Sequence, residues 1–443
     1  MNVVSSSAND FIIVYQAASS ATFAPNQPPI MLQNWPSAVG PVTLTFETEH
    51  RAVGPDVAVP GPIQVEARGG APTFTDAINA FGNLAAAILD VIAISTNCSV
   101  EQVEFRLGYD ATRGRDNREF RQTIIPNEAG LPRPNRLVPE EIMPLLRALM
   151  RHPEAGRLHR AISQYNGMLL NWAVGRNIVA NAHVWMAVEA LTKAFWNETK
   201  RTKSIDDRGV AVEMDVDIEK YDGFTLDRER NTEITSAVRR KMIFRGDDRC
   251  HRSVRKASDA YEHSFEPFGK VNGMASAALP TAAGYLRRAI FDLSGIDTDI
   301  AAALLSPPYD VPVAPWPPTI RIRGTMVGAA GGAAPEGLEY PSLEAEATMA
   351  AIRKPTDASY ETVVDMRITP AFREGIRFDI TGVENQGLVV RSARVPQELA
   401  AAMDTKDFQE GAQDTTLLPI LDSIATKEAT TATVNELETD VRE

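Results

Sequence analysis

The first 138 residues show short apolar runs that alternate with polar positions and are separated by Pro, Gly and Ser, a pattern typical of strands. Thr73 is followed three residues later by Asp76, which predicts a capped helix start. Apolar residues from Ile78 onward then recur at helical spacing. We therefore expect an α+β domain in which this helix packs on the sheet. The expected strands are residues 11–15, 42–47, 63–68, 103–107 and 120–125.

Longer segments with helical periodicity dominate residues 139–305, which predicts an α-helical domain. Residues 200–230 interrupt it with many charges and few apolar positions, so we expect a long mobile loop there. The expected helices are residues 140–152, 161–172, 178–197, 233–244, 249–265 and 281–293.

Six prolines between Pro307 and Pro318 predict a linker, after which short β-branched runs predict a β-rich domain over residues 306–395. Residues 396–443 carry about eleven acids against three bases and form an acidic tail. The expected fold class is thus α+β and multidomain, with a helical centre and β-rich flanks.

Composition places the chain among globular proteins, because 44% of its residues are hydrophobic and 23% are charged. No Lys or Arg precedes the first apolar run, so we expect no secretory signal. Residues 84–94, the most apolar stretch, contain Asp90 and are too short to cross a membrane. Cys98 and Cys250 are the only cysteines, which suits a reducing cytoplasm.

Common nucleotide and metal motifs are missing from the sequence. It contains no Walker A run, no H-E-x-x-H, no paired C-x-x-C and no G-x-S-x-G. The acidic stretch from Asp215 to Asp222 resembles a calcium loop, but Lys220 stands where glycine is required. We therefore expect no metal and no cofactor.

Charge is distributed unevenly along this acidic chain, whose net charge is −13. Residues 301–443 sum to about −10, whereas residues 139–297 are near neutral at about +2. Residues 239–256 hold about eight Lys or Arg against two acids. This run, with Arg245, Arg249 and Arg252, is the surface that we expect to face nucleic acid.

The segment that follows could carry acid–base chemistry. On a helix, Arg255, Asp259 and His263 fall on one stripe at spacings of four residues. Asp259 could then orient and raise the basicity of His263, while Arg255 or Lys256 faces a phosphate. The alternative is an ordinary ion-pair ladder on an exposed helix, which contributes only tenths of a kcal/mol per pair.

Three segments in order carry a resemblance to a known family. They are HVWMAVEALTKAF at residues 183–195, IFRGD at 243–247 with the basic helix that ends at His263, and YLRRAIFDL at 285–293. Together these about 150 residues resemble the HEPN domain, in its ApeA-like group. The resemblance implies a helical bundle that usually pairs into a dimer.

Active members of that family resemble one another in an Arg, four to six residues, and then a His, often followed by Gly. Here seven residues separate Arg255 from His263, six separate Lys256 from His263, and Ser264 stands in the place of Gly. The resemblance implies that the His and the cation promote metal-independent attack of the RNA 2′-hydroxyl on the adjacent phosphate. His263 would then handle the proton, and Arg255 or Lys256 would stabilise charge on the phosphate.

The leading hypothesis is a HEPN-like protein that binds or processes RNA, in bacterial defence or stress, as a homodimer or larger homo-oligomer. The rival is a non-catalytic interaction protein whose helical domain forms the assembly interface and whose acidic tail recruits a protein partner. A third is a subunit of a particle or shell. His183 and the tryptophans Trp172, Trp185 and Trp196 are expected in the core.

Overall fold

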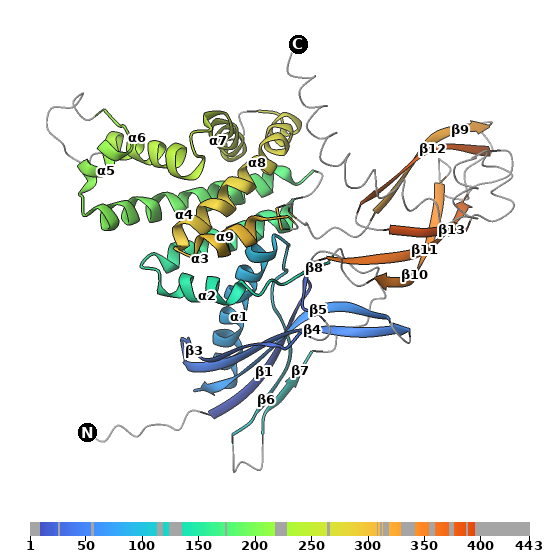
Figure 1. The fold of residues 1–443 in the computed structure, drawn as a ribbon. Coiled ribbons are helices and arrows are strands. Elements are labelled where there is room, and N and C mark those ends of the chain that lie inside the picture. Colours follow the sequence, from blue (N-terminus) through green and yellow to red (C-terminus); the bar gives the residue numbers. More distant parts are fainter. Residues whose placement is uncertain are drawn as a thin grey trace. The chain divides into compact units, whose positions relative to one another are not determined.

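The structure is a computed structural model (Figure 1). Two compact units emerge, each described by itself: residues 1–49, 61–126 and 136–315 form the first, and residues 50–60, 127–135 and 316–443 the second. The described residues are 9–24, 27–54, 57–112, 118–123, 135–172, 175–217, 228–263, 266–307, 309–310, 312, 319–328, 342–353, 359–371, 376–386 and 389–394. The predicted acidic tail, residues 396–443, lies outside them.

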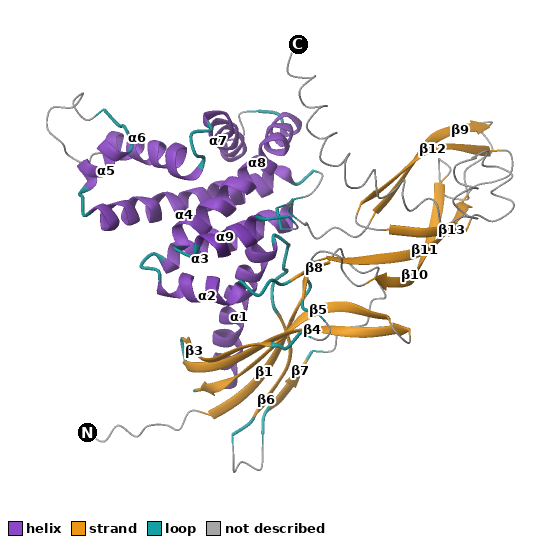
Figure 2. Ribbon diagram, viewed as in Figure 1, coloured by secondary structure: helices purple, strands orange, loops and turns teal. Residues whose placement is uncertain are grey.

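Helices and strands alternate little along the chain: strands come first, helices follow, and strands return (Figure 2). The helices are α1 (Phe74–Thr96), α2 (Ile142–Arg151), α3 (Ala155–Asn171), α4 (Asn177–Lys203), α5 (Asp207–Glu213), α6 (Arg228–Val238), the π-helix η1 (Arg239–Ile243), α7 (Asp248–His263), α8 (Phe268–Ser294) and α9 (Thr298–Leu305). The strands of the first region are β1 (Asn9–Ala17), β2 (Ala21–Thr22), β3 (Ile30–Ser37), β4 (Gly40–Gly54), β5 (Val57–Ala71), β6 (Glu104–Asp110), β7 (Phe120–Gln122) and β8 (Asn135–Leu137).

The N-terminal strands form a six-stranded sheet in the order β3-β4-β5-β1-β6-β7. β1 pairs antiparallel with both β5 and β6. Phe11, Ile13 and Tyr15 alternate along β1 and are buried, as a strand with one face on the core requires. The Tyr15 hydroxyl donates to the Ile78 carbonyl in α1 at 2.5 Å, which ties the sheet to the helix.

Helix α1 begins where the sequence predicts and packs on β1 and β6. The Thr73 hydroxyl accepts a hydrogen bond from the Asp76 backbone N–H at 3.1 Å, so the predicted N-cap is confirmed. The helix ends at Asn97, whose φ of 54° lies in the left-handed region. At 23 residues, α1 is the one described helix long and apolar enough to cross a membrane, although 56% of its most apolar window is buried inside the protein.

The helical region is built around α4, which packs against α3, α7 and α8 (Figure 1). One continuous core runs from Phe11 in β1 to Leu304 in α9. Residues on both sides of the boundary expected after residue 138 therefore lie in one compact unit. An N-terminal antiparallel sheet together with this helical region makes the first unit α+β, as the sequence predicts.

Arg287 of α8 is the least exposed charged residue in the part of the chain that the structure describes, and it joins three segments. Its guanidinium donates to the carbonyls of Ile94 and Ser95 at the end of α1, both at 2.8 Å. It also donates to Leu304 at 2.6 Å and to Tyr309 at 2.7 Å. Burial lowers its pKa to about 10, so it stays charged at neutral pH. Arg287 thereby satisfies the free carbonyls of a helix end from the inside.

The described strands of the second unit pair locally. They are β9 (Thr319–Gly328), β10 (Ser342–Arg353), β11 (Ser359–Ala371), β12 (Ile376–Gln386) and β13 (Val389–Arg394). β9 pairs antiparallel with β12, and β10 with β11, while β13 lies parallel to β11.

Three sequence expectations about the helices were wrong. The expected loop over residues 200–230 begins instead with the last turn of α4 and with α5, because Trp196 Nε1 and Lys200 Nζ both donate to Asp207, at 2.8 and 2.7 Å. The last helix starts at Phe268, well before Pro280, which it contains. The helix expected over residues 233–244 is divided into α6 and η1. Residues 218–227 of the expected loop lie outside the described residues.

Candidate nucleic-acid interface

Helix α7 has one buried face and one basic face. Its buried positions recur at helical spacing and pack on α4 and α8. The opposite face exposes Arg249, Arg252, Arg255, Lys256 and His263. The buried residues are Cys250, His251, Val254, Ala257, Ser258 and Ala260. The basic run of the sequence is therefore presented to solvent by a helix that is anchored by its other side.

A sharp reversal places α7 beside η1. Arg245 and Gly246 both have positive φ, 50° and 86°, a conformation that is unusual for Arg. The Asp247 carboxylate accepts from the Cys250 backbone N–H at 2.9 Å and so starts α7. Arg245 itself forms an ion pair with Asp292 of α8. The sequence interpretation of Arg245 as a phosphate ligand has to account for this partner.

The structure places the first two residues of the predicted stripe, Arg255 and Asp259, next to each other on α7. Arg255 Nε lies 3.4 Å from Asp259 Oδ2, and both side chains are about half exposed. Lys256 is exposed, and His263 is the exposed last residue of the helix. This geometry fits the ion-pair ladder as well as the acid–base site, so the catalytic assignment to His263 stays a prediction. Arg252 Nε donates to the Asp248 carbonyl one turn earlier, at 3.1 Å.

A denser group of side chains lies where α4, η1 and α7 meet. We name it the Arg239 cluster: Trp185 and Glu189 from α4, Arg239 and Arg240 from η1, and His251 and Arg255 from α7. A π-helix is rare and is frequently found at functional sites. Here it carries the two adjacent arginines into the cluster.

Arg239 is held by stacking on one aromatic ring and by one hydrogen bond. Its Cζ lies 4.6 Å from the centre of the Trp185 ring, a cation–π contact. Its Nε donates to Thr192 Oγ1 at 3.1 Å. Its Nη2 is 3.8 Å from Glu189 Oε1, beyond hydrogen-bond distance. The guanidinium is thus fixed in place while N–H groups at its outer end remain without a close acceptor among these neighbours.

His251 is enclosed by aromatic rings and faced by arginines. The imidazole is 4% exposed, and its centre lies 6.2 Å from Trp185 and 5.3 Å from Phe244. Within the described part of the chain, neither ring nitrogen has a hydrogen-bond partner. Burial, followed by the charges of Arg239, Arg255 and Arg240, lowers the pKa of His251 to about 4.

The ion pairs of the Arg239 cluster are loose. Besides the contacts at 3.4 Å and 3.8 Å, Arg240 Nη1 lies 3.9 Å from Asp248 Oδ1. Charge-assisted hydrogen bonds are about 2.7–2.9 Å long, so these carboxylates do not occupy the guanidinium donors at that distance. A phosphate oxygen could do so, because it can approach from solvent. The arrangement is suited to binding an anion.

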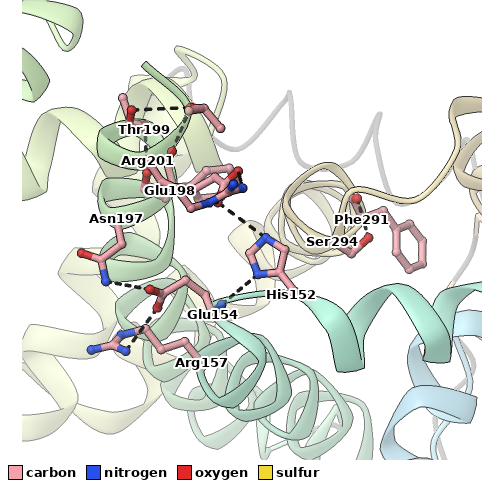
Figure 3. A network of polar contacts seen from close by, with 11 residues as sticks. His152, Glu154, Arg157, Asn197, Glu198, Thr199, Arg201, Phe291 and Ser294 are labelled. Atoms are coloured by element: carbon pink, nitrogen blue, oxygen red, sulfur yellow. Dashed lines mark hydrogen bonds and ion pairs between the residues drawn. The ribbon is translucent and has the colours of Figure 1, made fainter. Parts of the chain in front are cut away.

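A second candidate site is a network of polar contacts centred on His152 (Figure 3). His152 Nδ1 accepts from the Glu154 backbone N–H at 3.1 Å, which leaves the proton on Nε2, 3.7 Å from Glu198 Oε2. Glu154 in turn accepts from Asn197 Nδ2 at 2.9 Å. Burial lowers the pKa of His152. The imidazole therefore joins the α2–α3 turn to α4.

The charged residues around the His152 site are already paired. A cleft of about 470 Å³ lies beside it, lined among others by Glu198, Arg201 and Lys203. Arg201 pairs with Glu198, and Lys203 pairs with Glu213. Because these groups neutralise one another at close range, the cleft offers a ligand less than the Arg239 cluster does.

The remaining core predictions are confirmed in part. His183 is a bonded, part-buried histidine, with Nδ1 2.7 Å from Gln164 Oε1. Trp196 and Trp185 are buried, whereas Trp172 is only partly buried. Trp185 was assigned to the core alone, although the structure also places it under Arg239.

Sequence reasoning missed His251, and a signal for it exists. Five residues separate Arg245 from His251, which is within the spacing of four to six residues between Arg and His given above. The spacings considered in the sequence are those of Arg255 and Lys256 to His263. The contacts of Trp185 with Arg239 and with His251 join residues more than 50 positions apart, so no local pattern reveals them.

Among the described residues, no group of three or more His, Cys, Asp or Glu side chains is arranged to hold a metal ion. The candidate interface therefore rests on arginine, lysine and histidine. Comparison of the chain with family models, with curated proteins and with solved structures finds no match.

Proposed function

We propose that this is an RNA-binding protein of the HEPN type, which holds the RNA backbone on α7 and η1. The observation that carries the proposal is the Arg239 cluster, where three arginines meet with ion pairs no shorter than 3.4 Å. Lysine and arginine that neutralise phosphates supply most of the affinity for nucleic acid. In a chain of net charge −13, a face of this kind is a specific feature.

The exposed face of α7 continues the basic surface of the Arg239 cluster along the helix. Arg249, Arg252 and Lys256 lie within two turns of one another, and a turn of helix rises about 5.4 Å. The cations therefore lie about one turn apart along α7, so together they can meet more than one phosphate of a strand. We infer that single-stranded RNA runs along α7 and ends or turns at the Arg239 cluster.

The family resemblance supports the same region. The segments that carry it correspond to part of α4, the turn after η1 together with α7, and the second half of α8, and these helices pack against one another. Arg245 and His251 add a pair at the family's spacing. The resemblance also implies a homodimer, to be tested by light scattering across a dilution series.

Binding is tested with paired variants of equal charge. Arg239→Gln with Arg255→Gln removes two guanidinium groups from the cluster. The control, Arg151→Gln with Arg160→Gln, removes two exposed arginines from α2 and α3. Affinity for a fluorescent oligouridylate is measured from 50 to 200 mM salt. We expect the cluster variant to reduce the slope of log affinity against log salt by about 1.4, from about 0.7 per lost phosphate contact, and the control to keep it.

An equal loss of salt slope in both double variants would mean that RNA is attracted non-specifically by the charge of the protein. No loss of slope in either would show that the Arg239 cluster does not bind RNA. Oligouridylate that fails to bind the wild-type protein at 50 mM salt would favour the rival, a non-catalytic interaction protein.

Cleavage is a separate question with its own readout. We expect the isolated protein to cut RNA little or not at all, because His263 is exposed and the pKa of His251 is about 4, too low for an efficient base at neutral pH. Labelled RNA is incubated in EDTA with the wild type, His263→Ala and His251→Gln, and 2′,3′-cyclic phosphate ends are measured. Cleavage lost only in His263→Ala would establish the predicted base, and cleavage lost only in His251→Gln would transfer the role to the cluster.

A further inference from the structure

His251 leaves its hydrogen-bonding capacity unused in the interior. A neutral imidazole has one donor and one acceptor nitrogen, and both are buried here with no partner among the described residues. Buried polar groups are almost always hydrogen-bonded, so an exception requires an explanation. A residue serving only to fill space between Trp185 and Phe244 could have been apolar at no such cost.

The charges around His251 come from three elements. η1 supplies Arg239 and Arg240, and α7 itself supplies Arg255 and the opposing carboxylate of Asp248. α4 contributes Glu189, whose carboxylate lies 3.8 Å from Arg239 Nη2. α8 contributes Tyr285, whose ring packs on Phe244. Burial first, and then the excess of positive over negative charge around the imidazole, keeps the ring neutral.

We propose that the Arg239 cluster is a phosphate-binding site whose occupation by RNA draws one proton from solvent onto His251. The phosphate cancels the repulsion from Arg239, Arg240 and Arg255, and the attraction of Asp248 is then no longer outweighed. The proton goes from water to the unprotonated ring nitrogen, no covalent bond changes, and the imidazolium adds a fourth positive charge to the site. This inference rests on the proposed function and adds a proton to it.

The sign of the coupling follows from linkage. If binding favours the protonated imidazole, then protons must favour binding by the same factor. A phosphate relieves the repulsion from the arginines but not the burial, so the pKa of His251 should rise only part of the way from about 4 toward its ordinary value. Affinity should then rise severalfold from pH 7 to pH 5, and RNA binding at pH 6.0 should take up a fraction of a proton.

The decisive probe is an oligouridylate with hydroxyl ends. All its phosphates are diesters, which stay ionised across this pH range, so any proton taken up belongs to the protein. Calorimetry at pH 6.0 in two buffers of different ionisation enthalpy gives the number of protons directly. The same strand with a 5′-phosphate forms the second arm, and tighter binding of that strand would assign the cluster to a terminal phosphate rather than an internal one.

His251→Gln should bind the hydroxyl-ended strand with proton uptake reduced by at least half, whereas His159→Gln, an exposed histidine of α3, should keep it. Uptake that is unchanged in His251→Gln, or absent in the wild type while RNA binds, would overturn the inference and leave the proposed function standing. RNA that does not bind at all would overturn both.

If His251→Gln does not fold, the ring signals of His251 in the wild-type protein decide the matter by NMR. They should report a neutral ring at pH 6.0 without RNA and a clearly larger protonated fraction with it. An imidazole that stays neutral in the complex would equally overturn the inference.

Discussion

Two arginines in the helical region are largely withdrawn from solvent, and they differ in how their N–H groups are used. Arg287 donates to four backbone carbonyls at 2.6–2.8 Å, and its side chain is 2% exposed. Arg239 makes one hydrogen bond, to Thr192, and one loose contact, to Glu189 at 3.8 Å. Residue type and burial alone would class the two together.

The difference shows how hydrogen-bond accounting separates a structural cation from one available to a ligand. A guanidinium that uses four of its five donors inside the protein holds segments together, as Arg287 does for α1 and α8. A guanidinium fixed by an aromatic ring, with donors to spare, is positioned for a partner outside the chain. The unpaired ring of His251 beside Arg239 points the same way.

Arg287→Met should produce the largest effect on stability. It keeps much of the apolar stem, but leaves the carbonyls of Ile94, Ser95 and Leu304 without the Arg287 donor, while Tyr309 keeps Asn97 Nδ2 at 3.0 Å. A buried carbonyl left unsatisfied typically costs about 1–3 kcal/mol, so three of them make about 3–5 kcal/mol a conservative total. We expect a loss of this size in the free energy of unfolding, measured by urea denaturation of the helical region.

Arg288→Met is the matched control, because Arg288 is the next residue in α8 and is exposed. We expect a change of no more than about 0.5 kcal/mol from it. Equal losses in the two variants would show that Arg287 acts through helix propensity or net charge. Arg287 would then no longer serve as the structural cation in the comparison with Arg239.

Much of the fold was predictable because its signals are local. The β-branched and aromatic run from Phe11 to Tyr15 and the cap at Thr73 depend on a few neighbouring residues, and both the strand and the cap are confirmed. Helix α5 was not predictable, because its position depends on contacts of Asp207 with Trp196 and Lys200 rather than on its own composition.

The candidate site was predictable only as a basic run. Sequence identifies the cations from Arg239 to Lys256, and their helical spacing gives the exposed face of α7. Sequence cannot tell which cation is free for a ligand. The ion pair of Arg245 with Asp292 and the stacking of Arg239 on Trp185 are both tertiary contacts. His251 was passed over for the same reason, since its burial follows from packing.

The environment of Arg239 and His251 can be tested by varying the pH. Burial and then the arginines lower the pKa of His251 to about 4, below the ordinary value of about 6.5. The unfolded chain therefore binds a proton at a higher pH than the folded chain does. The stability that His251 contributes as a neutral ring is complete above about pH 6.5 and is lost as the pH falls toward 4, by about 1–3 kcal/mol.

His251→Gln should remove this pH-dependent part, so that the difference in unfolding free energy between wild type and variant shrinks from pH 7 to pH 4.5. Arg239→Gln should remove a fraction of it, since one of the three arginines is lost. Parallel curves for wild type and His251→Gln would mean that the imidazole titrates as it does in water and that the arginines do not act on it.

The smallest expected effect concerns His152, where a histidine is used structurally rather than left unpaired as at His251. His152→Ala removes both the acceptor for the Glu154 backbone N–H and the contact with Glu198. We expect a loss of about 1 kcal/mol, the usual size for a missing cap. Asparagine can accept from the backbone N–H two residues later, so His152→Asn should recover about half of that loss. Urea denaturation at pH 7 measures both. No recovery in His152→Asn would assign the stabilisation to the Glu198 contact, in which case Glu198→Gln should reproduce the full loss.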